Sequence, residues 1–381
     1  MHLPPLVDPG PPLTAAERER TARQRLLPEL GESGQRRLAA ARVLVIGAGG
    51  LGSPVLAYLA AAGVGTIGIV DDDVVDRSNL HRQVLHSEAS IGERKVQHAA
   101  RRLRELNPAV VIEEHEVRID ERTATEVLRG YDVVLDGTDT FATRYVVADA
   151  CADLGVPLVW GSILRLDGQV SVFWSHPPGD VAPVTLRDLF PAPPPPGSVP
   201  SCAEAGVLGP LCGIVGSMMA MEAIKLLVGF GDVLLGRVAV VDAATMRVHD
   251  VTFAGTGAPP SGLARATVPT ASNPAEPAAN PPATDLLGRT LLDVREPAEF
   301  AVDALSGALN VPVSALEQAV RTGPGAAAAL LREAGVPDGV PLATYCAAGV
   351  RAARAARTLA GLDRDVAALT PDDVARMRPR T

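Results

Sequence analysis

Three closely spaced glycines, Gly47, Gly49 and Gly52, follow an apolar run at residues 42–46 and precede a helix-like segment at residues 53–62. A strand, a glycine turn and a helix in this order can hold a phosphate with backbone N–H groups. Gly47 would make the tight bend, Gly49 would leave room for the anion, and Gly52 would let the helix pack close to the strand. The spacing therefore predicts a nucleotide-binding turn.

Charged and amide side chains follow the next apolar run. That run, residues 66–70, ends at Asp71, whose carboxylate can accept hydrogen bonds from ribose hydroxyls. Because glycines followed by an acid also occur in proteins that bind nicotinamide dinucleotides, this pattern alone does not exclude a nicotinamide-dependent oxidoreductase. Further along, the chain adds two cations and two amides: Asn79, Arg82, Gln83 and Lys95. Because Arg and Lys clamp transferring phosphoryl groups, and a triphosphate carries more charge than a dinucleotide, these side chains favour a triphosphate.

Motifs of a known family occur in order along the chain. They are Gly47 to Gly52, Asp71-x-Asp73, Ser78-Asn-Leu-His-Arg-Gln83, Lys95-Val and Asp136-Gly-Thr-Asp139. With them, residues 13–251 resemble the MoeB/ThiF-type adenylyltransferases, which activate ubiquitin-like sulfur carrier proteins and are related to the ubiquitin-activating enzymes. The resemblance implies that the protein uses ATP and Mg²⁺. It implies nucleotide contacts at Gly47, Gly49, Gly50, Gly52, Asp71, Asp73, Ser78, Asn79, Leu80, His81, Arg82, Gln83, Lys95, Asp139 and Thr140.

The same resemblance implies catalytic roles for three residues. Asp139 matches the carboxylate that coordinates magnesium, although an Asp here could also cap a helix starting at Thr140, where the family more often has Asn. Arg23 matches an arginine that reaches ATP from the partner subunit, which implies a homodimer. Cys202 matches a cysteine that links to the carrier through a thioester or disulfide, although a lone cysteine is most often a small buried residue.

A second, weaker resemblance covers residues 284–369. A strand ends at Cys346, a glycine-bearing loop follows, and a helix opens near Arg351. Backbone N–H groups at a helix N-terminus and a nearby arginine stabilise an anionic sulfur. The segment resembles a rhodanese, a sulfurtransferase that carries sulfane sulfur as a cysteine persulfide. Cysteine-dependent phosphatases of similar fold place five residues between cysteine and arginine, and the four found here favour sulfur.

Alternating strand and helix signals over residues 42–162 predict an α/β fold. We expect a doubly wound, mostly parallel, Rossmann-like sheet of ThiF type, followed by a second, smaller α/β rhodanese-like domain, a MoeZ-like arrangement. The expected domains are the adenylyltransferase at residues 1–254, a Pro/Ala/Gly-rich linker at 255–283 and the rhodanese-like domain at 284–381. We further expect disorder over residues 1–12 and a charged helix over residues 13–27.

Composition limits the partners and the compartment. A net charge of −9 argues against a nucleic-acid partner. Four cysteines without a C-x-x-C pair indicate a reducing compartment and cannot build a four-ligand zinc site, so no zinc is predicted. Cys151 and Cys212 are expected to be packing residues. The N-terminus has no signal-peptide pattern, and Glu222 and Lys225 interrupt the most apolar segment, so we expect a cytoplasmic protein that does not cross a membrane.

These observations predict one function and leave alternatives. The predicted function is ATP-dependent adenylation of the C-terminal glycine of a carrier ending in Gly-Gly, followed by sulfur transfer that yields a thiocarboxylate. The sulfur would come from a donor such as a cysteine desulfurase or thiosulfate. The alternatives are a nicotinamide-dependent oxidoreductase, a non-catalytic carrier-docking module, and ATP-dependent dehydration of a tRNA base, which the acidic balance disfavours.

Overall fold

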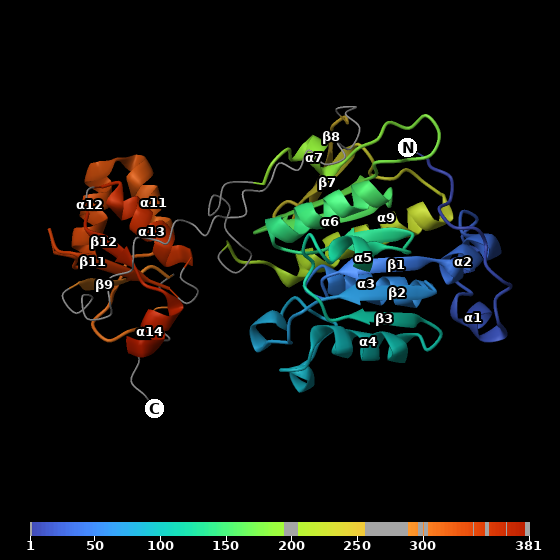
Figure 1. Ribbon diagram of the computed structural model, residues 1–381, viewed down its shortest axis with the longest axis horizontal. Coiled ribbons are helices and arrows are strands. Elements are labelled where there is room, and N and C mark those ends of the chain that lie inside the picture. The colour runs from blue at the N-terminus through green and yellow to red at the C-terminus, as the bar shows by residue number, and fades with distance from the viewer. Residues whose placement is uncertain are drawn as a thin grey trace. The chain divides into compact units, whose positions relative to one another are not determined.

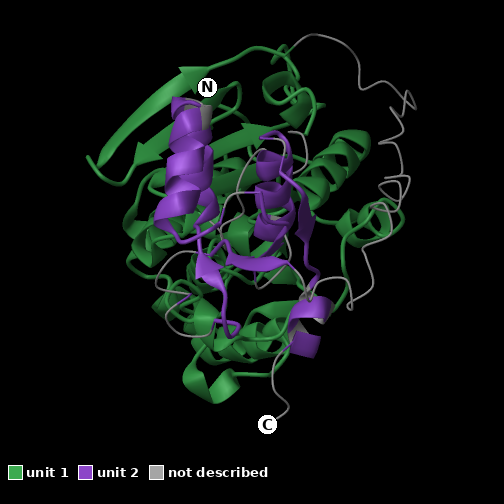
Figure 2. Cartoon of the chain, turned by 90° about the vertical axis from the view of Figure 1, so that its left-hand side faces the viewer, with its two compact units in different colours: residues 1–264 green, residues 265–381 purple. Residues whose placement is uncertain are grey.

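The computed structural model describes residues 2–193, 205–255, 289–295, 300, 304–337, 339–346, 350–362 and 364–377. The chain forms two compact units, residues 1–264 and residues 265–381 (Figures 1 and 2). Cys202 and the predicted linker from residue 256 onward lie outside the described residues.

The first unit is built on one eight-stranded sheet with the order β3-β2-β1-β4-β5-β6-β7-β8 (Figure 1). Its strands are β1 (Arg42–Ile46), β2 (Thr66–Val70), β3 (Val111–His115), β4 (Val133–Asp136), β5 (Leu158–Leu164), β6 (Asp167–Phe173), β7 (Arg237–Asp242) and β8 (Arg247–Thr252). The strands from β3 to β5 pair in parallel, and β6, β7 and β8 continue the sheet in antiparallel fashion. The order 3-2-1-4-5 is that of a doubly wound sheet, which confirms the predicted fold class.

Helices cover both faces of this sheet. The longer ones are α2 (Gly31–Ala40), α3 (Gly52–Ala62), α4 (Lys95–Leu106), α6 (Phe141–Leu154) and α9 (Gly209–Val228), and the short α5 (Ala124–Leu128) precedes β4. Side chains alternate between faces along a strand. On β5, Ser162 hydrogen-bonds to Arg144 of α6, whereas a Cβ on Gly161 would lie 2.3 Å from the Met219 sulfur of α9. Helices α6 and α9 therefore lie on opposite faces, and α9 also packs against α3.

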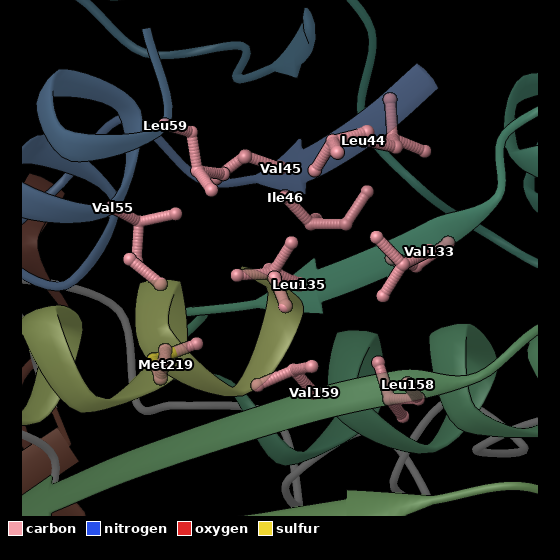
Figure 3. Close-up of a cluster of buried hydrophobic side chains, with 14 of the residues drawn as sticks. Leu44, Val45, Ile46, Val55, Leu59, Val133, Leu135, Leu158, Val159 and Met219 are labelled. Atoms are coloured by element: carbon pink, nitrogen blue, oxygen red, sulfur yellow. The ribbon is translucent and has the colours of Figure 1, made fainter. Parts of the chain in front are cut away.

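The core of the first unit lies between the sheet and these helices. Figure 3 shows apolar side chains of β1, β4 and β5 meeting those of α3 and α9, and the labelled residues are Leu44, Val45, Ile46, Val55, Leu59, Val133, Leu135, Leu158, Val159 and Met219. All are nearly inaccessible to solvent. Burying one such side chain contributes about 1.5–3 kcal/mol, so this core fixes the strand ends from which the functional loops leave.

Helix α9 is long and apolar enough to cross a membrane by length and composition, but 61% of its apolar stretch is buried in the structure. Its buried acid Glu222 accepts a hydrogen bond from the Leu234 N–H (2.8 Å) and pairs with Lys225. A buried charge is tolerated when it is paired and hydrogen-bonded. These contacts give α9 the character of a core helix, as the sequence predicted.

Two expectations at the N-terminus are wrong. Residues 2–12 are ordered rather than disordered, because Leu3 is buried and the Leu6 N–H donates to the Leu226 carbonyl of α9 (3.1 Å). The predicted helix at 13–27 is two pieces, α1 (Ala15–Arg20) and the short turn η1 (Gln24–Leu26). Helix α1 ends at Arg20 with Thr21 as its C-cap, and helix α2 then follows without having been predicted.

The second unit contains a four-stranded sheet with the order β10-β9-β11-β12, paired in parallel throughout. Its elements are β9 (Thr290–Asp293), β10 (Leu309–Asn310), α11 (Val313–Thr322), α12 (Pro324–Glu333), β11 (Leu342–Tyr345), α13 (Val350–Ala360), β12 (Val366–Ala368) and α14 (Pro371–Met377). Leu342 and Cys346 belong to one buried cluster, and Ala343 and Tyr345 to another. Alternate residues of β11 are thus covered on both faces, as in a parallel α/β sheet.

Candidate active site

The site in the first unit lies where the strand order reverses, between β1 and β4. Loops leave these neighbouring strands at their carboxyl ends, which is where doubly wound sheets bind ligands. The loop after β1 is the glycine loop, residues 47–52, and the loop after β4 is residues 137–140. A Cβ on Gly137 would lie 3.0 Å from the Leu51 Cβ, and one on Gly47 would lie 3.8 Å from the Gly137 carbonyl carbon. The two loops are therefore in contact.

The glycine loop has the geometry that its sequence predicts. Gly47 has a φ of +93°, which an L side chain rarely adopts. A Cβ on Gly52 would lie 1.8 Å from the Gly47 carbonyl oxygen, so only glycine lets the helix begin this close to the turn. The N–H groups of Gly49, Gly50 and Gly52 have no acceptor in the described part of the chain. Unpaired N–H groups at a helix start suit an anion.

Asp71 joins the second strand to the glycine loop. Its Oδ2 accepts a hydrogen bond from the Ala48 N–H (2.8 Å), and its Oδ1 accepts one from the Asp73 N–H (2.9 Å). Burial raises the pKa of Asp71, while the positive charge of Lys95 opposes that rise. Each carboxylate oxygen can accept a second hydrogen bond, so Asp71 keeps capacity for a hydroxyl donor.

Arg82 and Gln83 lie over the glycine loop. The Arg82 side chain passes 3.5 Å from the position of a Cβ on Gly50, and the Gln83 amide nitrogen lies 3.5 Å from that of Gly49. Gln83 is 4% exposed, and its Oε1 has no hydrogen-bond partner within the described segments. Buried polar atoms are nearly always hydrogen-bonded, so this unpaired oxygen sets Gln83 apart from an ordinary packing residue.

The segment before Arg82 holds the arginine in place. Arg82 donates to the Asn79 Oδ1 (2.7 Å) and to the Ser78 carbonyl (3.2 Å), and its Nη1 lies 2.9 Å from the His81 Nε2. Residues Arg77–Asn79 form one helical turn, η2, which ends at Leu80. The short turn therefore presents Asn79 and Arg82 on one side of the loop.

Lys95 is a buried cation at the start of α4. Its side chain is only 7% exposed, and its Nζ lies 2.8 Å from Asp73 Oδ2, a carboxylate that is itself 69% exposed. A buried cation needs such a partner, because an unpaired charge is costly away from water. Asp73 also accepts the Lys95 backbone N–H at its carbonyl (3.0 Å). The acid thus fixes the lysine beside Asp71.

The loop after β4 is braced by a buried acid and a buried arginine. Asp136 is fully buried, and its Oδ1 accepts hydrogen bonds from the N–H (2.9 Å) and the hydroxyl (2.7 Å) of Thr138. Burial raises the pKa of Asp136, with the charge of Arg144 opposing. Arg144 donates to the Thr138 carbonyl (3.3 Å) and lies over the Trp160 ring.

Asp139 projects from this braced loop as an exposed residue. It does not cap the following helix. The N-cap is Thr140, whose hydroxyl accepts a hydrogen bond from the Thr143 N–H (3.3 Å), and α6 begins at Phe141. The capping interpretation of Asp139 is therefore wrong, and its carboxylate is available to a ligand. The predicted metal role stays a prediction.

Other carboxylates are less suited to a cation. Ligand atoms of Asp71, Asp72 and Asp73 lie within 4.8 Å of one another. However, Asp73 is paired with Lys95, and Asp72 and Asp73 are both exposed. An exposed acidic group of this kind carries no metal assignment by itself.

Sequence reasoning missed two histidines beneath the glycine loop. His86 Nε2 lies 2.9 Å from the Ala48 carbonyl oxygen, and His86 Nδ1 lies 3.0 Å from His98 Nδ1. Both rings are buried. No sequence signal marks this contact, because twelve residues and an intervening turn separate two side chains that only the fold brings together. Arg144 was missed for the same reason.

Arg23 lies far from the glycine loop of its own chain. It is exposed and directly precedes Gln24, whose amide donates to the Ala62 carbonyl at the last residue of α3 (3.0 Å). The glycine loop lies at the opposite end of that eleven-residue helix, about 16 Å away at the usual rise per residue. Any contact of Arg23 with a nucleotide would thus involve another copy of the chain.

A cavity beside α1 is not part of this site. Its lining includes Arg20, Thr21 and Asn107, at the amino ends of the parallel strands. Arg20 donates to the Leu106 carbonyl (2.9 Å), and Asn107 donates to the Ala60 carbonyl (2.8 Å). Because its polar side chains are engaged with backbone, we assign it no ligand.

The cysteine site of the second unit is partly described. Cys346 is buried and directly follows β11, and α13 begins at Val350 with Arg351 as its second residue, partly exposed. On the neighbouring strand β9, Asp293 pairs with Tyr345 in the strand register. The Arg295 side chain donates three hydrogen bonds of 2.6–3.1 Å to the Asp293 carboxylate. The loop between Cys346 and α13, like Cys202, lies outside the described residues.

The remaining described cysteines are packing residues. Cys151 lies in α6 and Cys212 in α9, and both are buried. Burial raises the pKa of the Cys151 thiol well above its ordinary value, which makes it inert. The predicted lack of zinc stays a prediction.

Comparison with known proteins agrees with this geometry. Residues 21–258 match the model of the ThiF family, and residues 278–371 match that of the rhodanese-like domain. The "Probable adenylyltransferase/sulfurtransferase MoeZ" of Mycobacterium tuberculosis is 46% identical over 373 residues, which cover 93% of this chain and 91% of the relative. The "Sulfur carrier protein adenylyltransferase" of Thermus thermophilus is 53% identical over 232 residues, covering 60% of this chain and 85% of the relative.

A solved structure extends the comparison to the fold. The crystal structure of E. coli MccB with ATP superposes with a TM-score of 0.54 at 20% identity, covering 62% of this chain and 72% of that chain. This likeness supports the fold alone. The names of the sequence relatives confirm the predicted class of enzyme, an adenylyltransferase joined to a sulfurtransferase. The chain belongs to the ThiF family and carries a rhodanese-like domain after its ThiF region.

Proposed function

We propose that this chain uses ATP and Mg²⁺ to adenylate the C-terminal glycine of a ubiquitin-like sulfur carrier protein ending in Gly-Gly, and then transfers sulfur to it. One observation carries the proposal. Arg82 and Gln83 lie over a glycine loop whose N–H groups have no acceptor among the described residues, and Lys95 lies buried beside it. The diphosphate of a nicotinamide dinucleotide carries less charge than a triphosphate and needs fewer cationic and amide side chains to bind it.

The first step is adenylyl transfer. An oxygen of the carrier's terminal carboxylate attacks the α-phosphorus of ATP, the bond from that phosphorus to the bridging oxygen breaks, and pyrophosphate leaves. Arg82, Lys95 and the glycine-loop N–H groups offset the charge that develops on the phosphates. Asp71 would hold the ribose hydroxyls. Since the protein supplies no covalent group, positioning and electrostatics supply the rate.

Asp139 is the residue that would hold Mg²⁺. Its exposed carboxylate belongs to the loop at residues 137–140, whose Gly137 contacts the glycine loop, and Mg²⁺ in such sites takes one or two carboxylates together with phosphate oxygens. When bound, the ion neutralises charge on the leaving pyrophosphate. Asp136 and Arg144 hold the Asp139 loop in position through Thr138.

The second step is sulfur transfer at Cys346. The terminal sulfur of a Cys346 persulfide attacks the adenylated carbonyl and releases AMP, which leaves an acyl disulfide. The thiolate of Cys202, or an external thiol, then attacks the Cys346 sulfur and releases the carrier thiocarboxylate with formation of a new disulfide. A further thiol reduces that disulfide. Arg351 would stabilise the anionic sulfur before transfer.

Several partners and conditions belong to the same proposal. Arg23 would reach the nucleotide of a second copy, so the working unit would be a homodimer. The sulfur donor would be a cysteine desulfurase or thiosulfate. We propose a cytoplasmic enzyme without zinc, without a nucleic-acid partner and without a membrane span, with domains at residues 1–254 and 284–381 joined by the linker at 255–283.

Exchange of labelled pyrophosphate into ATP tests the first step. We expect exchange only when a carrier ending in Gly-Gly is present, and the matched control is the same carrier with its last glycine removed. No exchange with any Gly-Gly carrier from the same source would refute adenylation. Carrier binding without exchange would support a docking module, and tighter binding of NAD than of ATP would support an oxidoreductase.

Thiocarboxylate formation tests the second step. A Cys346→Ala variant should keep pyrophosphate exchange and lose thiocarboxylate, whereas a Cys151→Ala variant should keep both, because Cys151 is a buried packing residue. Unchanged thiocarboxylate output from Cys346→Ala would refute the role of this cysteine.

A further inference from the structure

The residue in the middle of the glycine turn, Ala48, is fixed on both sides of its backbone. Its N–H donates to Asp71 Oδ2 (2.8 Å), and its carbonyl oxygen lies 2.9 Å from His86 Nε2. Asp71 comes from the end of β2, and His86 follows the η2 turn. Two elements distant in sequence thus hold a single residue of the loop.

The proton positions in this contact follow from the chemistry of the groups. A carbonyl oxygen only accepts, so His86 Nε2 must carry the proton and donate it. In neutral imidazole the other nitrogen is then an acceptor, and His98 Nδ1, at 3.0 Å, must be its donor. Burial lowers the pKa of His86 to about 4 and also lowers that of His98, so both rings are neutral near pH 7.

Fixing the Ala48 carbonyl also fixes the next N–H. No cis peptide bond occurs among the described residues, and in a trans peptide the carbonyl and the following N–H point in opposite directions. With the Ala48 carbonyl held by His86, the Gly49 N–H points away from the buried histidines. That N–H, like those of Gly50 and Gly52, finds no acceptor in the part of the chain that is described.

A glycine loop needs such a restraint. Glycine residues adopt many backbone conformations, so the peptide between Ala48 and Gly49 can rotate at low steric cost. A rotated peptide would present a carbonyl oxygen to the ligand instead of an N–H, and an oxygen repels a phosphate. An ordinary packing histidine would need no hydrogen bond to this carbonyl.

We propose that His86 is a positioning residue for phosphate binding: its Nε2–H holds the Ala48 carbonyl inward so that the Gly49 N–H faces the nucleotide phosphates, and His98 keeps His86 in the donating tautomer. The proposal rests on the proposed use of ATP at this loop. It concerns the phosphates only, so it separates recognition of phosphate from recognition of the nucleoside.

Two substitutions of His86 and one control separate this role from packing. His86→Phe keeps a ring and removes the donor, whereas His86→Gln places an amide donor near the position of Nε2. The control is His115→Phe. His115 is the last residue of β3, and its Nε2 lies 2.8 Å from the Tyr131 hydroxyl rather than beside Ala48. The affinities for ATP and for adenosine are measured by calorimetry on the full chain, and KM for ATP and kcat by pyrophosphate exchange.

The expected result is a selective loss of phosphate recognition. His86→Phe should bind ATP about 10- to 100-fold more weakly, the value of one hydrogen bond to a charged group, with a matching rise in KM. Its affinity for adenosine should stay within about twofold of wild type. His86→Gln should recover most of the ATP affinity, and His115→Phe should bind both ligands as wild type does.

Several outcomes would overturn the proposal. They are unchanged ATP affinity in a folded His86→Phe variant, an equal loss of adenosine and ATP affinity, and no recovery in His86→Gln. If the wild type binds ATP but no carrier supports exchange, adenylation is refuted, while the binding comparison still decides the role of His86. A wild type that binds no ATP refutes both.

Discussion

Replacing His86 with a residue that does not titrate should make the free energy of unfolding of the first unit depend less on pH in the acid range. The folded-state pKa of His86 is about 4, against an ordinary value of 6.5, because the ring is buried. Below pH 6.5 the unfolded chain binds a proton that the folded chain does not. Stability supplied by the neutral ring is therefore complete above pH 6.5 and is lost as the pH falls toward 4.

The size of the effect follows from these two values. Between pH 7.5 and pH 5 the shift corresponds to a loss of about 2 kcal/mol in the free energy of unfolding. A His86→Gln variant cannot titrate at this position and should lose that much less over the same range. Urea unfolding followed by tryptophan emission is the assay. Both tryptophans, Trp160 and Trp174, lie in the first unit, so unfolding of the second unit does not enter the signal.

An exposed histidine provides the control. His249 lies on β8 and is solvated, so His249→Gln should keep the acid dependence of the wild type. Equal acid dependence in wild type and His86→Gln would show that the His86 ring is not buried and neutral, and it would refute the hydrogen-bond geometry inferred for Ala48. Calorimetric proton uptake on acid unfolding provides an independent check.

Three further substitutions test the loops around the site. Asp139→Asn should lower the rate of pyrophosphate exchange at least ~100-fold. Because Asp139 is exposed and caps no helix, the free energy of unfolding in urea should change by no more than ~0.5 kcal/mol. A large loss of stability would contradict this prediction. Gly52→Ala should destabilise the first unit by more than ~2 kcal/mol, since its Cβ would lie 1.8 Å from a carbonyl oxygen, and a wild-type unfolding midpoint would contradict that contact. Thr140→Ala should cost ~1 kcal/mol through loss of the α6 cap, and no change in unfolding would show that the cap contributes nothing.

The nucleotide loop could be predicted because its determinants are local. Gly47 and Gly52 are required by a backbone conformation and by a contact within six residues of each other, and the structure contains both. The same holds for Asp71, which ends a strand whose apolar residues are readable in the sequence. Local backbone rules act over a few residues, so a short pattern carries the whole constraint.

The N-terminal errors have the opposite cause. Residues 2–12 contain many prolines, which favour irregular backbone, yet Leu3 is buried against the rest of the first unit. Propensity is a weak guide where distant apolar surface is available to cover. The α1 helix likewise ends before the predicted boundary, and beyond it the Gln24 amide donates to the Ala62 carbonyl, nearly forty positions away.

The amino-acid sequence by itself determined the alternation of strands and helices over residues 42–162, the glycine turn and the side chains that favour a triphosphate, because each depends on neighbouring residues. Only the tertiary structure decided that Arg144 of α6 reaches the Thr138 carbonyl while lying over Trp160 of β5, and that His86 and His98 lie beneath Ala48. These contacts join separate elements, and their energies depend on burial and on partners that no local pattern specifies.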